Sequence, residues 1–363
     1  MIEMIPYSAL TLSALGGLFA TMLLIADRFL ANYGPCRIDV NGERSVTVEG
    51  GCTVLDALYS NEVFIPSGCG GQGTCGHCKV TLLSGGGPVL PTELPLLSEQ
   101  EIAAGVRLAC QVKVKQDVEL RVREEYFSIQ RFTAEVAAAR MLTHDTREVR
   151  LRLVEPPIID FRPGQYVQVE VPVKGESVHR AYSISSAPEQ AGEIGLIVRL
   201  VPGGAGSTYL HRVRAGDRVS FTGPYGEFVL SEHPETEVVC VAGGCGIAPI
   251  KCILEYVCRR WPARPCRLFF GVRAARDLLC MDEFRRLARE HPAFAVHCAL
   301  SAPEPGDEWD GETGLIHLSV ERHLAPGPPR QAFLCGPEPM VRATEEVLRA
   351  RDVPDAMIYY DNW

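Results

Sequence analysis

The sequence has no excess of positive charge. Lysine and arginine together number 36 against 45 aspartates and glutamates, which gives a net charge of −9 over 363 residues. Because neutralising nucleic-acid phosphates requires a basic face, this balance argues against nucleic acid as a main partner. The mean hydropathy of +0.04 is too low for a polytopic membrane protein. No low-complexity linker or internal repeat is visible, and the length predicts about two or three abutting globular domains.

Cysteine is abundant, with 14 residues. A secreted disulfide scaffold is an unsuitable explanation at this chain length, because such scaffolds are small and dense in cysteine. We therefore expect some of the cysteines to be metal ligands and the others to be buried reduced thiols.

The amino-terminal segment contains one long uncharged run. No charged side chain lies between Glu3 and Asp27, so residues 4–26 form an uncharged run of 23 residues. As a helix this run is about 35 Å long, which is enough to cross a hydrocarbon core of about 30 Å. A signal peptide is the alternative. We expect a retained single-span anchor, since the run is long and no basic residue precedes it.

Four cysteines of residues 36–125 carry the spacing of an iron–sulfur site. Cys69, Cys75 and Cys78 follow the pattern C-x5-C-x2-C, and Cys110 lies on a later segment. Three thiolates on a tight loop and a fourth from a distant strand are the ligand set of a [2Fe–2S] cluster. Five glycines in the loop let the backbone wrap closely and point N–H groups at the sulfurs.

The alternatives for these cysteines are a zinc site or a group of buried thiols. Zinc ligands usually come as a C-x2-C pair with a second such pair or with two histidines, and neither arrangement occurs here. His77 lies between two of the cysteines and is expected to face solvent. Before the loop, short strands are expected at 37–40 and 45–49, with a helix from about residue 53.

The middle of the chain contains three short motifs that together suit a pyrophosphate. A turn and strand at 161–169 are followed by the tetrapeptide R-x-Y-S at 180–183. A glycine-rich turn then opens a short helix, whose free N–H groups suit a pyrophosphate. The hydroxyls of Ser207 and Thr208 can assist, with Arg180 as the countercharge. The alternative for this block is a small antiparallel barrel without a ligand.

The remainder of the chain alternates strands with helices. A buried strand at 238–242 runs into the segment G-G-C-G and a helix, which together form a nucleotide-binding element with phosphates over the helix start. Pro249 lies where the full dinucleotide fingerprint has its third glycine. Further strands are expected at 267–270, 295–300 and 332–334. This alternation predicts a parallel doubly wound sheet with ligands at the carboxyl ends of its strands.

In this order the motifs resemble the ferredoxin–NADP reductase superfamily fused to a ferredoxin. With the amino-terminal run, the whole chain resembles the family of F subunits of the sodium-translocating NADH:quinone oxidoreductases. The segments at 85–93 (GGGPVLPTE) and 107–112 (RLACQV) are similar to the sequences of that family. The resemblance implies four parts, which are a transmembrane anchor and linker (1–35), a β-grasp [2Fe–2S] ferredoxin domain (36–125), an antiparallel β-barrel FAD domain (126–232) and a doubly wound parallel α/β NAD domain (233–363).

The resemblance also implies roles for individual residues. The cluster ligands would be Cys69, Cys75, Cys78 and Cys110. The FAD contacts would be Arg180 on the pyrophosphate, Tyr182 on the flavin ring, Ser183 near its nitrogen N5, and Gly206, Ser207 and Thr208 at the pyrophosphate. The nucleotide contacts would be Gly244, Gly246, Pro249 and Gly336. The residues beside the reacting rings would be Ser183, Cys335 and the terminal Trp363.

The function implied is that of an NADH-dependent oxidoreductase in electron transport. A nicotinamide gives two electrons together and a [2Fe–2S] cluster accepts one at a time, so FAD must stand between them. The implied partners are other membrane subunits, with a quinone or another protein as acceptor. The implied location is the bacterial cell membrane, with the catalytic parts in the cytoplasm. NADH is preferred from the resemblance, although Arg273 and Arg276 are candidates for binding a 2′-phosphate.

Two departures from the family keep alternatives open. Only 13 residues (167–179) separate the segment P-G-Q-Y from the tetrapeptide R-x-Y-S, whereas the family has a long insertion at this point. The chain also stops at Trp363, without the glycines that normally follow the aromatic residue. The compact flavin domain resembles the reductases of soluble oxygenases, so a membrane-tethered oxygenase reductase is the first alternative. A non-enzymatic redox carrier or sensor is the second, and the intact flavin and nucleotide motifs argue against it.

Overall fold

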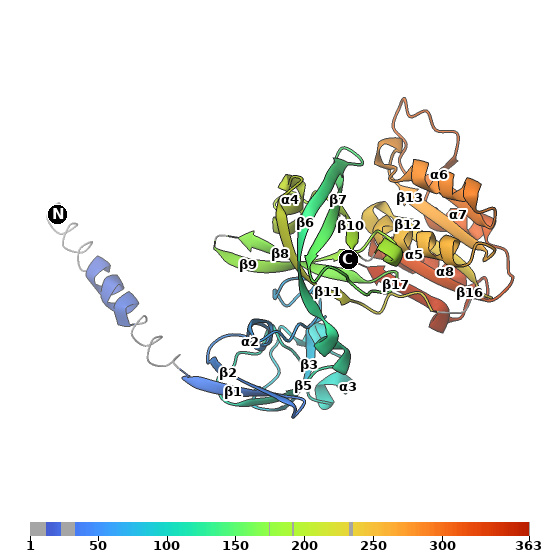
Figure 1. Cartoon of the computed structure of the whole chain (residues 1–363). Helices are drawn as coiled ribbons and strands as arrows, with labels where there is room; N and C mark the ends of the chain where they lie inside the picture. The colour runs from blue at the N-terminus through green and yellow to red at the C-terminus, as the bar shows by residue number, and fades with distance from the viewer. Residues whose placement is uncertain (1–11, 23–32, 174, 191, 232–234, 363) are drawn as a thin grey trace, which may run out of the picture. The chain divides into compact units, whose positions relative to one another are not determined.

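The computed structural model describes residues 12–22, 33–173, 175–190, 192–231 and 235–362. The chain divides into two units, Met1–Ser128 and Ile129–Trp363 (Figure 1). Residues 12–22 are helical, and the expected membrane-spanning run 4–26 otherwise lies outside the described residues. Among the residues that are described, no helix combines the length and the apolar character that crossing a membrane requires.

In the first unit a five-stranded mixed sheet packs against a short helix. The strand order is β2-β1-β5-β3-β4. Strands β1 and β5 are parallel, and the other neighbours are antiparallel. The elements are β1 (Pro35–Val40), β2 (Arg44–Glu49), α2 (Val54–Ser60), β3 (Lys79–Ser84), α3 (Glu99–Ala103), β4 (Val106–Leu108) and β5 (Val118–Arg121). The strands and helix expected before the cysteine loop are confirmed.

Alternation of side chains explains how this sheet buries its core. Ile38, Val40 and Leu120 point to the same face and are fully buried with Leu58 of α2. Helix α2 begins after Thr53, whose hydroxyl accepts a hydrogen bond from the backbone N–H of Asp56 as an N-cap. The cysteine loop therefore connects two elements of one packed core, helix α2 and strand β3.

The second unit begins with a curved antiparallel sheet, a half-barrel in the order β10-β7-β6-β11-β8-β9. One bridge between Ile184 and Leu196 connects the segment after β9 to β10. The elements are β6 (Gln130–Met141), β7 (Thr146–Glu155), β8 (Tyr166–Val173), β9 (Glu176–Ser183), β10 (Glu193–Arg199), α4 (Ala205–Arg212) and β11 (Arg218–Tyr225). This is the antiparallel domain that the middle block predicted.

The same unit continues into a six-stranded parallel sheet, in the order β15-β14-β13-β12-β16-β17. Its strands are β12 (Glu237–Gly243), β13 (Cys266–Val272), β14 (Phe294–Leu300), β15 (Glu312–Thr313), β16 (Arg330–Gly336) and β17 (Ile358–Asn362). Its helices are α5 (Ile247–Arg260), α6 (Met281–Glu290), α7 (Ile316–His323) and α8 (Glu338–Arg349). The four expected strands are confirmed, and β15 and β17 extend the sheet at its two edges.

Helices cover both faces of the parallel sheet. Alternate residues of β12 pack in opposite directions, so that Cys240 lies in the core under α5 and α6 while Val241 lies in the core under α7 and α8. The strand order reverses between β12 and β16, because the chain leaves β14 and β15 and returns to the other side of β12. In such sheets ligands bind outside the carboxyl ends of the strands at this switch point.

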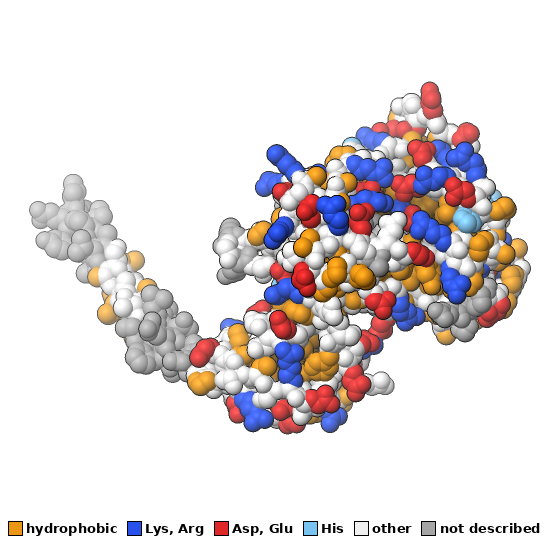
Figure 2. Space-filling view, viewed as in Figure 1, with side chains coloured by type: hydrophobic (Ala, Val, Ile, Leu, Met, Phe, Trp, Pro, Cys, Tyr) orange, Lys and Arg blue, Asp and Glu red, His pale blue; other side chains and the backbone are white. Residues whose placement is uncertain are grey.

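The surface does not carry one dominant sign of charge on the face shown in Figure 2. Lysine and arginine side chains are interspersed there with aspartates and glutamates. On this face charges of both signs are therefore mixed and do not form one acidic field.

Candidate functional site

The four cysteines expected to hold the cluster come together as two close pairs. The Sγ atoms of Cys69 and Cys75 are 3.4 Å apart. Cys78 and Cys110 form the second pair through a hydrogen bond between their thiols. Four thiols grouped two and two on a loop and a strand end suit two iron ions, each held by a pair of sulfurs. The donor set therefore fits a [2Fe–2S] cluster.

Backbone amides also point at these sulfurs. A hydrogen bond from the Cys75 thiol, assisted by the N–H groups of Thr74 and Cys75, holds the pKa of the Cys69 thiol below its ordinary value. The N–H of Gly73 makes the same kind of contact with the sulfur of Cys110. Gly73 has a φ of +70°, in the left-handed region that favours glycine. The loop thus supplies the amide donors that stabilise negative charge on thiolates, and His77 is exposed as expected.

A buried ion pair fixes the loop that follows β3. The guanidinium of Arg107 donates to both carboxylate oxygens of Glu93, and both side chains are almost completely buried. Arg107 also donates to the carbonyls of Gly86 and Gly87. The Glu93 carboxylate in addition accepts from the backbone N–H of Leu108, two residues before Cys110. The motifs at 85–93 and 107–112 are therefore one structural unit that holds the fourth cysteine.

The residues expected to bind FAD meet where β9 approaches the start of α4. A Cβ atom added to Gly206 would lie 2.5 Å from the hydroxyl of Tyr182 and 2.9 Å from Cγ of Arg180. Only glycine leaves room for these two side chains beside the helix start. Among the described residues Arg180 has no carboxylate partner, so its guanidinium is available for a phosphate. Burial raises the pKa of Tyr182 to about 12, which keeps its hydroxyl protonated. This cradle fits a pyrophosphate beside an aromatic ring.

The remaining residues of the expected FAD site have different surroundings. The Ser207 hydroxyl accepts from the N–H of Val201 at 3.0 Å and is turned to the carbonyls of its own loop. It therefore stabilises the glycine-rich turn, while Thr208 is only half-buried on the first turn of α4. Ser183 ends β9 and pairs with Tyr166 of β8.

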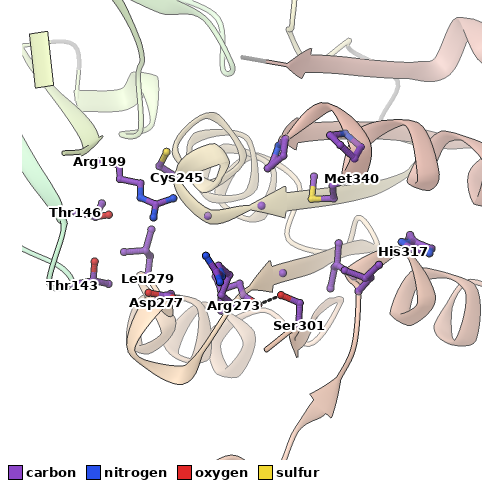
Figure 3. Close-up of a pocket in the computed structure, with 18 of the residues that line it drawn as sticks. Thr143, Thr146, Arg199, Cys245, Arg273, Asp277, Leu279, Ser301, His317 and Met340 are labelled. Carbon is purple, nitrogen blue, oxygen red and sulfur yellow. Dashed lines mark hydrogen bonds between the residues drawn. The ribbon is translucent and has the colours of Figure 1, made fainter. Parts of the chain in front are cut away.

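A cavity of about 450 Å³ lies at the carboxyl ends of the parallel strands (Figure 3). Gly243, Gly244 and Cys245 form one wall at the end of β12, and Gly271 to Arg273 lie at the end of β13. Pro337 and Met340 come from the start of α8. The cavity therefore occupies the switch-point position that the sheet order indicates for a nucleotide.

One side of this cavity is built by the antiparallel domain, which the sequence motifs did not indicate. Thr143 and Thr146 lie at the turn between β6 and β7, and Arg199 ends β10 (Figure 3). Asp145 lies between the two threonines in the sequence and also lines the cavity. Arg199 donates to Asp145 at 2.7 Å, and Asp145 also accepts from the hydroxyls of both threonines. Burial alone would raise the pKa of Asp145, but these hydrogen bonds hold it below its usual range. A fixed guanidinium thus faces the nucleotide cavity.

Several residues expected to bind the nucleotide do not line the cavity. A Cβ on Gly246 would be 2.2 Å from the carbonyl oxygen of Cys335, and one on Gly336 would be 3.1 Å from Cα of Gly243. Gly246 lets the start of α5 approach β16 very closely, and Gly336 lets the ends of β16 and β12 lie close together. Cys335 and Pro249 are buried. Of the expected nucleotide contacts, Gly244 alone is in the cavity lining.

The two arginines considered for a 2′-phosphate have different environments. Arg276 forms an ion pair with Glu304 at 2.8 Å and is not in the cavity lining. Arg273 does line the cavity, together with Asp277. The expected stacking residue Trp363 lies outside the described residues, directly after the last described residue of β17.

Comparison with protein families assigns a type to each of the three domains. A profile described as 2Fe-2S iron-sulfur cluster binding domain matches residues 38–115. One described as oxidoreductase FAD-binding domain matches residues 133–230. One described as oxidoreductase NAD-binding domain matches residues 240–346. The cysteine pairs and the cradle at Gly206 fall within the first and second of these matches, and the cavity is lined by residues of the second and the third.

The chain is similar along nearly its whole length to curated proteins. It is 35% identical to the F subunit of the Na(+)-translocating NADH-quinone reductase of Neisseria meningitidis serogroup B, over 95% of both chains. It is 34% identical to the corresponding F subunit of Klebsiella pneumoniae, over 94% of this chain and 95% of the relative.

Two solved structures share the fold. The Amycolatopsis cytochrome P450 reductase GcoB is 33% identical with a TM-score of 0.72, and the match covers 90% of this chain and 98% of that protein. The ferredoxin reductase in carbazole 1,9a-dioxygenase is 28% identical with a TM-score of 0.70 and has the same coverage.

Proposed function

The chain belongs to the family of the F subunits of Na(+)-translocating NADH-quinone reductases, and from this membership we propose that it is the electron-input subunit of such a membrane complex. It is an NADH-dependent flavin and iron–sulfur oxidoreductase that transfers electrons through FAD to a [2Fe–2S] cluster. We propose that its partners are the other subunits of the complex and that a quinone is the final electron acceptor. The proposed location is the bacterial cell membrane, with residues 1–35 as the anchor and the catalytic domains in the cytoplasm.

The observation that carries this proposal is how far the similarity extends. The matches to the F subunits leave out about 5% of 363 residues, or about 18 residues, so the 35-residue amino-terminal segment cannot lie wholly outside them. The solved oxygenase-type reductases leave out about 10%, or about 36 residues. The chain therefore shares with the F subunits more sequence than the three redox domains of a reductase require.

The proposed roles of the residues follow from their positions. Bound FAD exchanges two electrons with a nicotinamide and single electrons with a [2Fe–2S] cluster, which is the chemistry that the cofactors supply. Arg180 and the N–H groups at the start of α4 bind the FAD pyrophosphate, and Tyr182 flanks the flavin. The four cysteines hold the cluster. Arg199 and Gly244 bind the dinucleotide, and the close packing at Gly246 fixes the cavity wall against β16.

The role of Arg199 can be tested by one substitution. The Arg199→Gln variant is expected to raise the KM for NADH about tenfold with little change in kcat, because a charge-assisted hydrogen bond to the nucleotide is worth roughly 1.5–3 kcal/mol. Arg152→Gln is the matched control, since Arg152 is equally exposed and pairs with Glu135 at 2.6 Å, away from the cavity. Equal KM values for NADH in the two variants would show that Arg199 does not bind the nucleotide.

A second candidate function is the reductase component of an oxygenase. The alignment to the F subunits spans 388 positions, 25 more than the 363 residues of this chain, so those relatives contain residues that this chain lacks. The similarity to the P450 reductase covers 98% of that protein. Both observations favour a compact reductase that delivers electrons to a separate oxygenase.

Quinone reduction in membranes distinguishes the two functions. In membranes of the native host, NADH-driven quinone reduction is expected to be stimulated by Na⁺ and to be lost when the chain is deleted. Re-expression of the full chain should restore it. The proposal fails if deletion leaves Na⁺-stimulated quinone reduction intact. Simultaneous loss of an NADH-dependent oxygenation would then identify the oxygenase reductase.

A further inference from the structure

Three potential metal ligands converge at the edge of the parallel sheet, apart from the cofactor sites. His297 lies in β14, Glu312 in the edge strand β15, and His323 at the end of α7. One donor atom from each lies within 4.8 Å of the other two. The pairing of β15 with β14 and the packing of α7 against β14 bring the three side chains together.

The surroundings of His297 leave its ring nitrogens available for metal binding. The ring of His297 stacks between Phe269 at 4.9 Å and His323 at 4.3 Å. Among the described residues, neither of its ring nitrogens has a hydrogen-bond partner. A ring nitrogen of His297 is therefore available to a metal ion.

The carboxylate is oriented by other side chains, as metal ligands usually are. Oε1 of Glu312 lies 2.7 Å from Nε2 of His323 and accepts from the buried hydroxyl of Ser319 at 3.0 Å. The other oxygen accepts from Arg322. Glu312 thus presents one fixed oxygen to the two imidazoles.

Nearby arginines leave this oxygen and the imidazoles accessible. Arg322 occupies only Oε2 of Glu312. Arg267 is engaged by Glu237 at 2.7 Å and by the backbone carbonyl of His323. Glu312 and His323 are both partly exposed, so an ion can enter from solvent.

We propose that His297, Glu312 and His323 bind one Zn²⁺ ion through two imidazole nitrogens and one carboxylate oxygen. Two histidines and a carboxylate with water in the fourth position are an established ligand set for zinc. Ligands at about 2.1 Å in a tetrahedron are roughly 3.4 Å apart, so the three donors close around the ion by side-chain rotation. The ion replaces the hydrogen bond between His323 and Glu312.

The site connects directly to the nucleotide cavity. Residues 314–317, between Glu312 and the body of α7, line that cavity. A bound ion ties β15 to the far end of α7 and so restrains this wall. Zinc binding is therefore expected to change the KM for NADH more than kcat.

Zinc binding to the tag-free holoenzyme, with full flavin and iron content, tests the proposal. Competition with a chromophoric zinc chelator is expected to give one Zn²⁺ per chain. His297→Gln, Glu312→Gln and His323→Gln should each weaken binding by about a hundredfold or more. Ser319→Ala, which removes only the support of the carboxylate, should weaken it about tenfold.

His291→Gln is the matched control, because His291 lies on the same domain at the end of α6 and outside the cluster. It should bind zinc as the parent does. The absorbance of the iron–sulfur cluster must stay constant through the titration, because a decrease would mean that zinc displaces iron from the cluster. Stoichiometric zinc that persists in two or more of the three ligand variants would overturn the proposal, as would the absence of binding in the parent. Three separate variants keep the test valid if one does not fold.

Discussion

We expect the Cys110→Ser variant to lose electron output to one-electron acceptors by about a hundredfold or more, while NADH still bleaches the bound flavin. Cys110 is buried, pairs with the thiol of Cys78 and is approached by the side-chain amide of Gln111. Serine retains the shape of the site but offers a harder oxygen that replaces thiolate poorly on iron. Losing this ligand opens one side of the cluster.

Three measurements follow this loss. Iron content and the EPR signal of the reduced protein should fall together, and NADH consumption with a cluster-dependent acceptor should fall with them. Cys52→Ser is the control, because Cys52 is a half-buried thiol of the same domain outside the two pairs. A Cys110→Ser protein with the parent's iron content and EPR signal would remove Cys110 from the ligand set.

Replacing Arg107 with methionine is expected to lower the free energy of unfolding of the ferredoxin domain by about 3–5 kcal/mol, because it leaves the buried Glu93 carboxylate without its cation. Neither residue of the pair is exposed to a significant extent. Arg107 also satisfies the carbonyls of Gly86 and Gly87, so the loop that precedes α3 should loosen. Urea unfolding monitored by cluster absorbance measures the change.

A surface pair provides the comparison for Arg107. Arg123 and Glu125 are 3.0 Å apart, but both are more than half exposed. Arg123→Met should therefore change stability by less than about 1 kcal/mol. The double variant Arg107→Met, Glu93→Leu should recover much of the loss, because it removes the buried charge as well. Equal losses for Arg107→Met and Arg123→Met would contradict the importance of burial.

The Arg107 effect should also depend on pH. Burial alone would raise the pKa of Glu93, but hydrogen bonds from Arg107 and two backbone N–H groups hold it below its usual value. A depressed pKa in the folded state stabilises the fold above the unfolded pKa of about 4.3, and this contribution disappears as the pH falls through the folded value. The stability difference between the parent and Arg107→Met should therefore shrink below about pH 4.

Much of the architecture could be predicted from local sequence patterns. The buried run at 238–242 and the later apolar runs became adjacent parallel strands, because continuous apolar segments can be buried only between two layers of helices. The short edge strands β15 and β17 were not predicted. Residues 312–313 are too few to give a pattern, and β17 pairs along only one edge.

The nucleotide site was only partly predictable. The glycines after β12 mark the position of the cavity, and Gly244 does line it. Gly246 has a different role, which is visible only from its distance to Cys335. Arg199 and Asp145 are 54 residues apart, and no spacing rule relates them to a glycine turn in another domain.

Local sequence alone sets the chemistry of this protein. The spacing of Cys69, Cys75 and Cys78 fixes a thiolate loop, because a short segment rich in glycine can bring its sulfurs close together. The order of the flavin and nucleotide motifs fixes which cofactors the domains bind.

Packing between distant segments determines which groups share a site. The half-barrel packs against the parallel sheet and places Arg199 in the nucleotide cavity, and the buried pair of Arg107 and Glu93 fastens one motif to another. Edge-strand pairing brings the two histidines and the glutamate of the proposed zinc site together. The physical reason is that backbone geometry limits neighbours in sequence, whereas contacts between distant segments depend on how complete elements pack to bury their apolar faces.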